Sequence, residues 1–133
     1  MSNCKTISHQ KDIQERAFFF ACRIVKLYQF LARKGGGVEV LGRQLLCSGT
    51  SIGANLEEAT AGQSKADFIS KCNIALKEAR EAHYWLRLLV QAEIISAKKL
   101  NNLLNESDEL VAILTTIVKK SRLSQNKLPV HSP

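Results

Sequence analysis

The sequence predicts an all-α protein, an up-and-down antiparallel four-helix bundle. Apolar residues recur at intervals of three and four in four stretches, at about residues 10–34, 38–61, 64–91 and 97–121. The connections between these stretches are short, which forces neighbouring helices to run antiparallel. No stretch has the alternating pattern of a β-strand. We therefore expect one domain, a bundle over residues 10–121, which suits a chain of 133 residues.

The first helix has a complete core stripe at helical spacing. Its members are Ile13, Ala17, Phe20, Ile24, Leu27 and Leu31. A second stripe widens the apolar surface to about half of the helix circumference. Its members are Phe18, Ala21, Val25, Tyr28 and Ala32. Lys34 followed by glycines 35–37 predicts the end of the helix. Residues 1–9 have no pattern and are predicted to form a flexible arm.

The second helix is unusual in its glycines. Gly42, Gly49 and Gly53 lie together beside the apolar face that contains Leu45 and Ile52. Each glycine within a helix costs about 1 kcal/mol relative to alanine. Such a cost predicts a neighbouring helix that approaches closely. We expect that neighbour to be the third helix, which offers the small residues Ala75, Ala79 and Ala82.

The opposite side of the second helix lacks the wide charged face of an outer helix. Its apolar residues recur every seven positions, at Val40, Cys47, Ala54 and Ala61. A polar row runs beside them: Gln44, Ser48, Ser51, Asn55 and Glu58. We interpret this side as a contact with another copy of the chain, in a homo-oligomer. The polar row is either a recognition surface or, as we favour, a set of hydrogen bonds at a helix or subunit seam. The residues predicted for oligomer contact and close packing are Val40, Cys47, Gly49, Ser51, Gly53, Ala54 and Asn55.

Caps predict the limits of the last two helices. Ser64 and Asp67 form a capping box for the third helix, and Ser96 caps the fourth. The apolar residues of the fourth helix continue to Val118. Residues 122–133 contain two prolines and no periodicity, and are predicted to form a disordered tail.

Composition favours some functions and argues against others. The chain has 19 Lys and Arg against 12 Asp and Glu, a net charge of +7, which favours an anionic partner. The four cysteines form no CxxC pair, and Glu81 and His83 do not make the Glu-x-x-His motif of di-iron bundles. We predict no catalytic residue, no metal, no cofactor and no enzymatic activity. Without a long apolar run or a secretory signal, we expect a cytoplasmic protein that does not enter the membrane.

Two segments carry a resemblance to a known family. The run SGTSIGANLEEA at 48–59, with SKADFISKCNIALKEAREAHYWLRLL at 64–89, closely resembles the bacterial 23S rRNA intervening-sequence proteins, often labelled ribosomal proteins. The resemblance covers about residues 18–120. It implies an up-and-down bundle, often a pentamer, without established enzymatic activity. A more distant resemblance is to the accessory protein of diversity-generating retroelements, a basic pentamer that engages a reverse transcriptase and nucleic acid.

Two basic rows are the candidate binding residues. The first helix carries Arg16, Arg23, Lys26 and Arg33, interleaved with Phe19 and Phe30. The third helix carries Lys77, Arg80, Tyr84 and Arg87. Cations bind phosphates and aromatic rings stack on unpaired bases, so these rows suit nucleic acid. The rows are equally compatible with a solvated face or a protein-docking face. The sequence therefore predicts a non-enzymatic oligomeric scaffold that binds RNA or DNA, with RNA favoured. The alternative is a scaffold that docks an acidic protein partner or a reverse-transcriptase-like enzyme.

Overall fold

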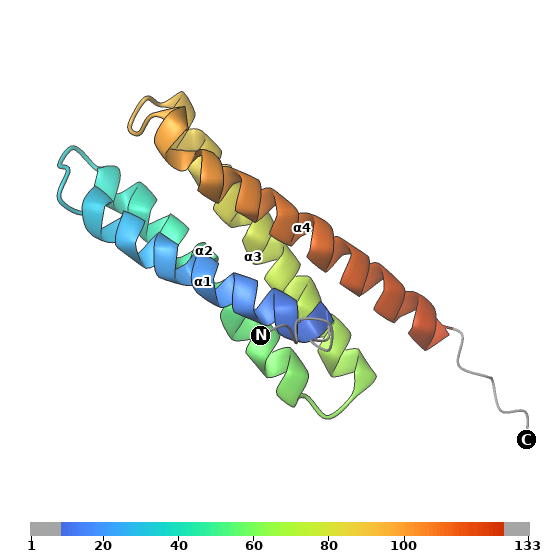
Figure 1. Ribbon diagram of the computed structural model, residues 1–133. Helices are drawn as coiled ribbons and strands as arrows, with labels where there is room; N and C mark the ends of the chain where they lie inside the picture. The colour runs from blue at the N-terminus through green and yellow to red at the C-terminus, as the bar shows by residue number, and fades with distance from the viewer. Residues whose placement is uncertain (1–8, 127–133) are drawn as a thin grey trace, which may run out of the picture.

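The computed structural model describes residues 9–126, with side chains described from Asp12 onward. It contains four helices (Figure 1): α1 (His9–Leu31), α2 (Val38–Ala61), α3 (Lys65–Gln91) and α4 (Ala97–Asn126). Consecutive helices run antiparallel and lie side by side. No residue between 9 and 126 forms a strand. The predicted all-α four-helix bundle is confirmed.

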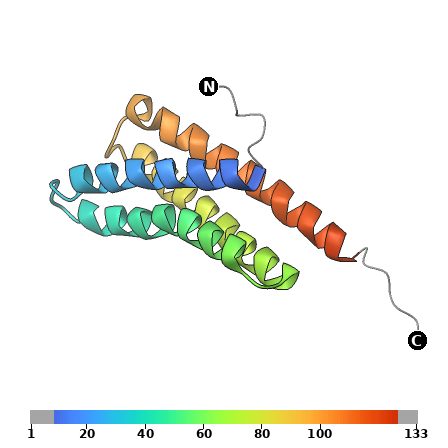
Figure 2. The same ribbon diagram turned by 60° about the horizontal axis from the view of Figure 1, so that its bottom comes forward.

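The helices do not pack equally. Each helix packs along the next one in the chain, whereas α1 contacts α4 over a smaller area. Over the described residues, α1 and α3 lie on a diagonal of the bundle, so their backbones stay apart although their side chains share the core. The C-terminal part of α4 extends past the first turn of α1 in both views (Figures 1 and 2). The α1–α4 seam is therefore the open side of the bundle.

The core follows the predicted stripes. Ile13, Phe20, Ile24 and Leu31 are fully buried, together with apolar residues from the other three helices. The second stripe of α1 lies outside this core and is exposed or half-buried along the border with α2. Phe18, for example, is 64% exposed.

The glycine edge of α2 packs against α1, so the predicted pairing with α3 is wrong. A Cβ atom at Gly49 would lie 2.9 Å from two side-chain carbons of Ile24. One at Gly42 would lie 3.3 Å from Leu31, and one at Gly53 would lie 3.6 Å from Ala17. The three contacted residues of α1 repeat every seven positions and match the glycines in antiparallel register. The alanines of α3 are buried in the core instead.

The helix ends largely follow the predicted signals. The Ser64 hydroxyl accepts a hydrogen bond from the Asp67 amide at 3.1 Å, and Ser96 accepts one from the Lys99 amide at 3.4 Å. After α1, Gly36 and Gly37 adopt φ values of 70° and 85°, which strain any other residue.

Two predicted helix ends are wrong. The α1 helix ends at Leu31, three residues before the predicted end at 34, so Arg33 lies in the turn after it. The α4 helix continues to Asn126, five residues past the predicted end at 121, because no glycine or proline interrupts it before Pro129. The predicted tail at 122–133 therefore starts too early. Its remainder (127–133) and most of the predicted arm at 1–9 lie outside the described residues.

Candidate nucleic-acid interface

The basic row of α3 forms one exposed face. Lys77, Arg80, Tyr84 and Arg87 follow one another at spacings of three and four, and all are exposed. The Tyr84 ring is 47% exposed, and the Arg87 guanidinium carbon lies 5.9 Å from its centroid. No carboxylate within the described chain forms an ion pair with any of the three cations. The row therefore presents positive charge and an aromatic ring together to solvent.

The basic row that begins on α1 contains one ion-paired residue, and the other cations of the row are unpaired within the described residues. Arg16 differs from the others because its guanidinium is bound by two carboxylates of α4. Its Nε and Nη2 donate to Glu106 at 3.0 and 2.7 Å, and Nη2 also donates to Glu109 at 2.6 Å. These hydrogen bonds raise the pKa of Arg16 further above its usual value. Arg16 thus joins α1 to α4 through ion pairs, and its charge is not available for a phosphate contact.

The other basic residues of this row, two on α1 and Arg33 in the turn after it, remain exposed. Arg23, Lys26 and Arg33 form no ion pair within residues 12–126. The Phe30 ring beside them has Lys34 Nζ at 5.0 Å and Lys99 Nζ at 6.0 Å from its centroid. Lys99 reaches this ring from α4, a contact that sequence reasoning missed because the two residues are far apart in the chain.

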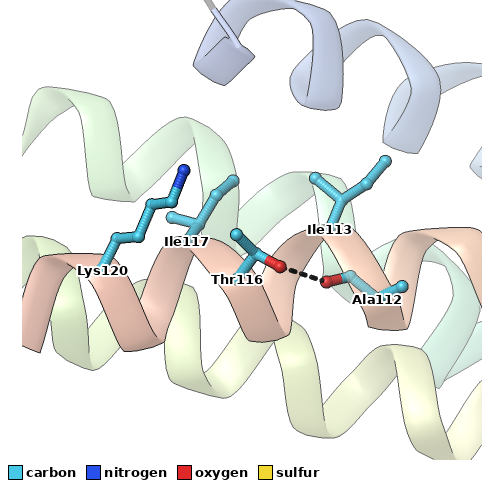
Figure 3. Close-up of a pocket in the computed structure, with 5 residues that line it drawn as sticks. All are labelled: Ala112, Ile113, Thr116, Ile117 and Lys120. Carbon is cyan, nitrogen blue, oxygen red and sulfur yellow. Dashed lines mark hydrogen bonds between the residues drawn. The ribbon is translucent and has the colours of Figure 1, made fainter.

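An apolar hollow of about 370 Å³ lies on the side of α4 that is turned toward α1, and all of its lining residues belong to α4 (Figure 3). Ile113, Ile117 and Lys120 point from α4 toward the side on which α1 lies. The Thr116 hydroxyl donates to the Ala112 carbonyl at 3.2 Å, so its proton is engaged within the helix. The hollow offers one cation and few polar groups, which does not suit a phosphate site.

A basic groove of about 360 Å³ lies on the other side of α4, between α3 and α4. Arg80 lines it from α3, and Lys119 and Arg122 line it from α4. The α4 residues were absent from the sequence-predicted set. Thr115, Lys119 and Arg122 are spaced by four and three residues, which would place them on one helix face. The sequence prediction missed this face because it ended the helix at 121, before Arg122. The two predicted basic rows belong to α1 and α3, which lie on a diagonal of the bundle and are not neighbouring helices.

Three of the seven residues predicted for oligomer contact and close packing are exposed on α2, whereas Gly49 is buried and Ser51, Gly53 and Asn55 are half-buried. Val40 is 56% exposed, and Cys47 and Ala54 are also exposed. A groove of about 330 Å³ between α1 and α2 borders Phe18, Ala21 and Ala54. The exposed second stripe of α1 and the apolar side of α2 therefore adjoin each other.

The polar row of α2 makes hydrogen bonds mainly within its own helix. Ser48 donates to the Gln44 carbonyl at 3.1 Å, Ser51 to Cys47 at 2.6 Å, and Asn55 to Ser51 at 2.8 Å. Glu58 accepts from Lys71 of α3 at 2.7 Å. Glu58 thus makes the expected hydrogen bond at a helix seam, whereas Ser48, Ser51 and Asn55 bond to carbonyls of α2 itself.

Two buried side chains of types that can act as nucleophiles, Ser107 and Cys72, have the contacts of structural residues. The buried Ser107 hydroxyl donates to the Leu104 carbonyl at 2.9 Å, and its oxygen lies 2.8 Å from His83 Nδ1. A serine whose proton is held by a carbonyl is not activated by the histidine. Burial raises the pKa of the Cys72 thiol to about 11, which keeps it protonated and unreactive.

Within the described residues, no three His, Cys, Asp or Glu side chains are placed to hold a metal ion. No helix there is long and apolar enough to cross a membrane.

These features define a small antiparallel helical bundle with basic and apolar surfaces on different seams. The chain belongs to the family of 23S rRNA-intervening sequence proteins, which matches residues 9–116. A similar crystal structure is that of a protein with unknown function from the S23 ribosomal protein family of Bacteroides thetaiotaomicron. It shares 45% sequence identity with a TM-score of 0.78, over 84% of this chain and 99% of that chain. A comparison with curated proteins gave no match. The predicted resemblance to the 23S rRNA intervening-sequence proteins is confirmed.

Proposed function

We propose that this protein is a non-enzymatic, oligomeric scaffold of the cytoplasm that binds single-stranded nucleic acid, with RNA as the favoured polymer. The observation that carries the proposal is the α3 row of Lys77, Arg80, Tyr84 and Arg87. Its cations are exposed and lack carboxylate partners in the described chain, and the Tyr84 ring is accessible beside them.

The chemistry of this row suits an unpaired strand better than a duplex. Guanidinium groups bind phosphate through two parallel hydrogen bonds. An exposed aromatic ring offers a stacking surface to an unpaired base, whereas the bases of a duplex are already stacked. The family name refers to intervening sequences of 23S rRNA, which agrees with RNA as the first polymer to test.

An oligomer would repeat this row on every subunit. The exposed side of α2, with Val40, Cys47 and Ala54, adjoins the exposed Phe18 of α1 and supports a contact with a second copy. A pentamer is the form that the family resemblance favours. Repeated rows would bind successive segments of one strand and raise the overall affinity without any new contact.

Fluorescence anisotropy with a labelled single-stranded RNA of mixed sequence tests the proposal. We expect the variant Lys77→Gln/Arg87→Gln to bind more weakly and with a smaller salt dependence than the wild type. The control is Lys65→Gln/Lys98→Gln, which removes two charges from other exposed positions that also form no ion pair in the described chain. Equal losses in both variants would show that only net charge matters. Absence of wild-type binding at low salt would refute the proposal and favour the scaffold that docks an acidic protein partner.

A further inference from the structure

We infer that the groove between α3 and α4 is a phosphate-binding site that anchors the backbone of a single-stranded nucleic acid. This inference rests on the proposed function and assigns a definite site to it. The cations that define the groove are Arg80 of α3 and Lys119 and Arg122 of α4.

The first argument is the placement of the cations on two facing helices. Arg80 forms part of one wall, and Lys119 and Arg122 form part of the other. A phosphate in the groove can therefore be contacted from both sides, unlike a phosphate that rests on a single helix face. Two of the three cations are arginines, whose planar groups bind phosphate oxygens in pairs.

The second argument is the absence of competing carboxylates. No Asp or Glu lines the groove, and none of its three cations forms an ion pair within the described residues. Asp108 lies on the same side of α4 but seven residues before Thr115, roughly 10 Å along the helix axis. That distance is about one Debye length at 0.1 M salt, so salt weakens the effect of its charge on the groove. The α1–α4 seam differs, since Glu106 and Glu109 already neutralise Arg16 there.

The third argument is the floor of the groove. Leu76 and Val118 form an apolar base and are almost fully buried. Charges interact more strongly beside such a low-dielectric surface than in bulk water. Asn73 on the rim adds an amide that can donate to a phosphate oxygen. Thr115 cannot add another donor, because its hydroxyl donates to the Val111 carbonyl at 2.7 Å.

Arg80 belongs to both the groove and the exposed row of α3. Tyr84 and Arg87 follow it at four and seven residues, roughly 6 and 10 Å along the helix. A strand anchored in the groove can thus continue along the row, where a base reaches the Tyr84 ring. The groove determines where the backbone binds, and the row supplies the next contacts.

Adjacent lysines of α4 provide a matched test. Lys119 lines the α3–α4 groove, whereas Lys120 lines the hollow beside α1, and both are exposed. We expect Lys119→Gln to weaken binding of the labelled single-stranded RNA, and Lys120→Gln to leave it nearly unchanged. Lys119→Arg should retain binding. Equal losses for Lys119→Gln and Lys120→Gln would overturn the inference, because the effect would then be one of net charge.

A double variant measures the number of contacts. For a single strand, the log–log salt slope is about −0.7 per phosphate contact. If Lys119→Gln/Arg122→Gln loses two contacts, the slope should fall by about 1.4, so the advantage of the wild type shrinks about sevenfold between 0.05 and 0.2 M salt. The control Lys120→Gln/Lys98→Gln removes two charges outside the groove and should keep the wild-type slope. Circular dichroism checks that each variant is folded.

The outcomes separate the two proposals. If the wild type binds RNA and the double variant has the same affinity and slope, the groove is not the site, while the proposed function stands. If the wild type does not bind RNA at low salt, the proposed function itself fails, and the inference fails with it.

Discussion

Two glycines of α2 allow the close packing of α1 and α2 to be tested by single methyl groups. At Gly49, a new Cβ atom would lie 2.9 Å from both Cγ1 and Cγ2 of Ile24. Ile24 is fully buried and β-branched, so its side chain has one strongly preferred rotamer in a helix. The methyl group therefore has to push α1 away from α2. At Gly53, the nearest atoms belong to Ala17 at 3.6 Å, an ordinary van der Waals contact.

The two variants have opposite expected signs. Replacing a helical glycine with alanine gains about 1 kcal/mol in helix propensity. Gly53→Ala keeps this gain and should stabilise the protein. Gly49→Ala has the same gain but adds an overpacking cost of about 1–3 kcal/mol, so its net effect is a loss of up to about 2 kcal/mol. The propensity gain cancels in the comparison, and the difference between the variants reports the overpacking cost alone.

Thermal and urea denaturation at one protein concentration, followed by circular dichroism, measure this difference. For a chain of this length, 1 kcal/mol corresponds to about 4 °C in Tm, so Gly49→Ala should melt about 4–12 °C below Gly53→Ala. Equal melting temperatures would refute the reasoning, because they would show that α1 and α2 separate without cost. Gly53→Ala also serves as the control for any general effect of removing a glycine from α2.

Three further predictions concern other parts of the bundle. Because burial raises the pKa of the Cys72 thiol from 9.0 to about 11, the unfolded state loses this proton first as the pH rises. Wild-type stability should therefore fall by roughly 2 kcal/mol between pH 9 and 11 relative to Cys72→Ala; parallel pH profiles from urea denaturation would contradict this. Tyr84→Ala should weaken single-stranded RNA binding by about 1–3 kcal/mol and duplex binding less, whereas Tyr84→Phe should retain both. A ratio of single-strand to duplex affinity that does not change in anisotropy titrations would exclude stacking. Light scattering coupled to size exclusion should give a mass several times 14.8 kDa. Val40→Glu/Ala54→Glu should lower that mass and the control Ala66→Glu should not; a monomeric wild type would rule out the predicted assembly.

The local features of this protein were open to prediction from the sequence. The spacing of apolar residues gave four helices and the core stripe of α1, and Ser64 and Ser96 marked the starts of α3 and α4. These signals lie within one helix or its first turn, so they do not depend on how the helices are arranged. The exposure of the basic row of α3 could also be predicted from one helix alone, because a run of polar positions on one helix face rarely lies in a core.

Only the tertiary structure decided which helix faces meet. Periodicity places glycines on one edge of α2, but it does not tell whether α1 or α3 fills that edge; the register of Gly49 against Ile24 does. Arg16 looked like a free cation until folding placed Glu106 and Glu109 beside it, 90 and 93 residues away. The α3–α4 groove likewise needs two helices in a definite rotation and register. Such pairings depend on the packing of whole helix surfaces, which no single helical stretch encodes by itself.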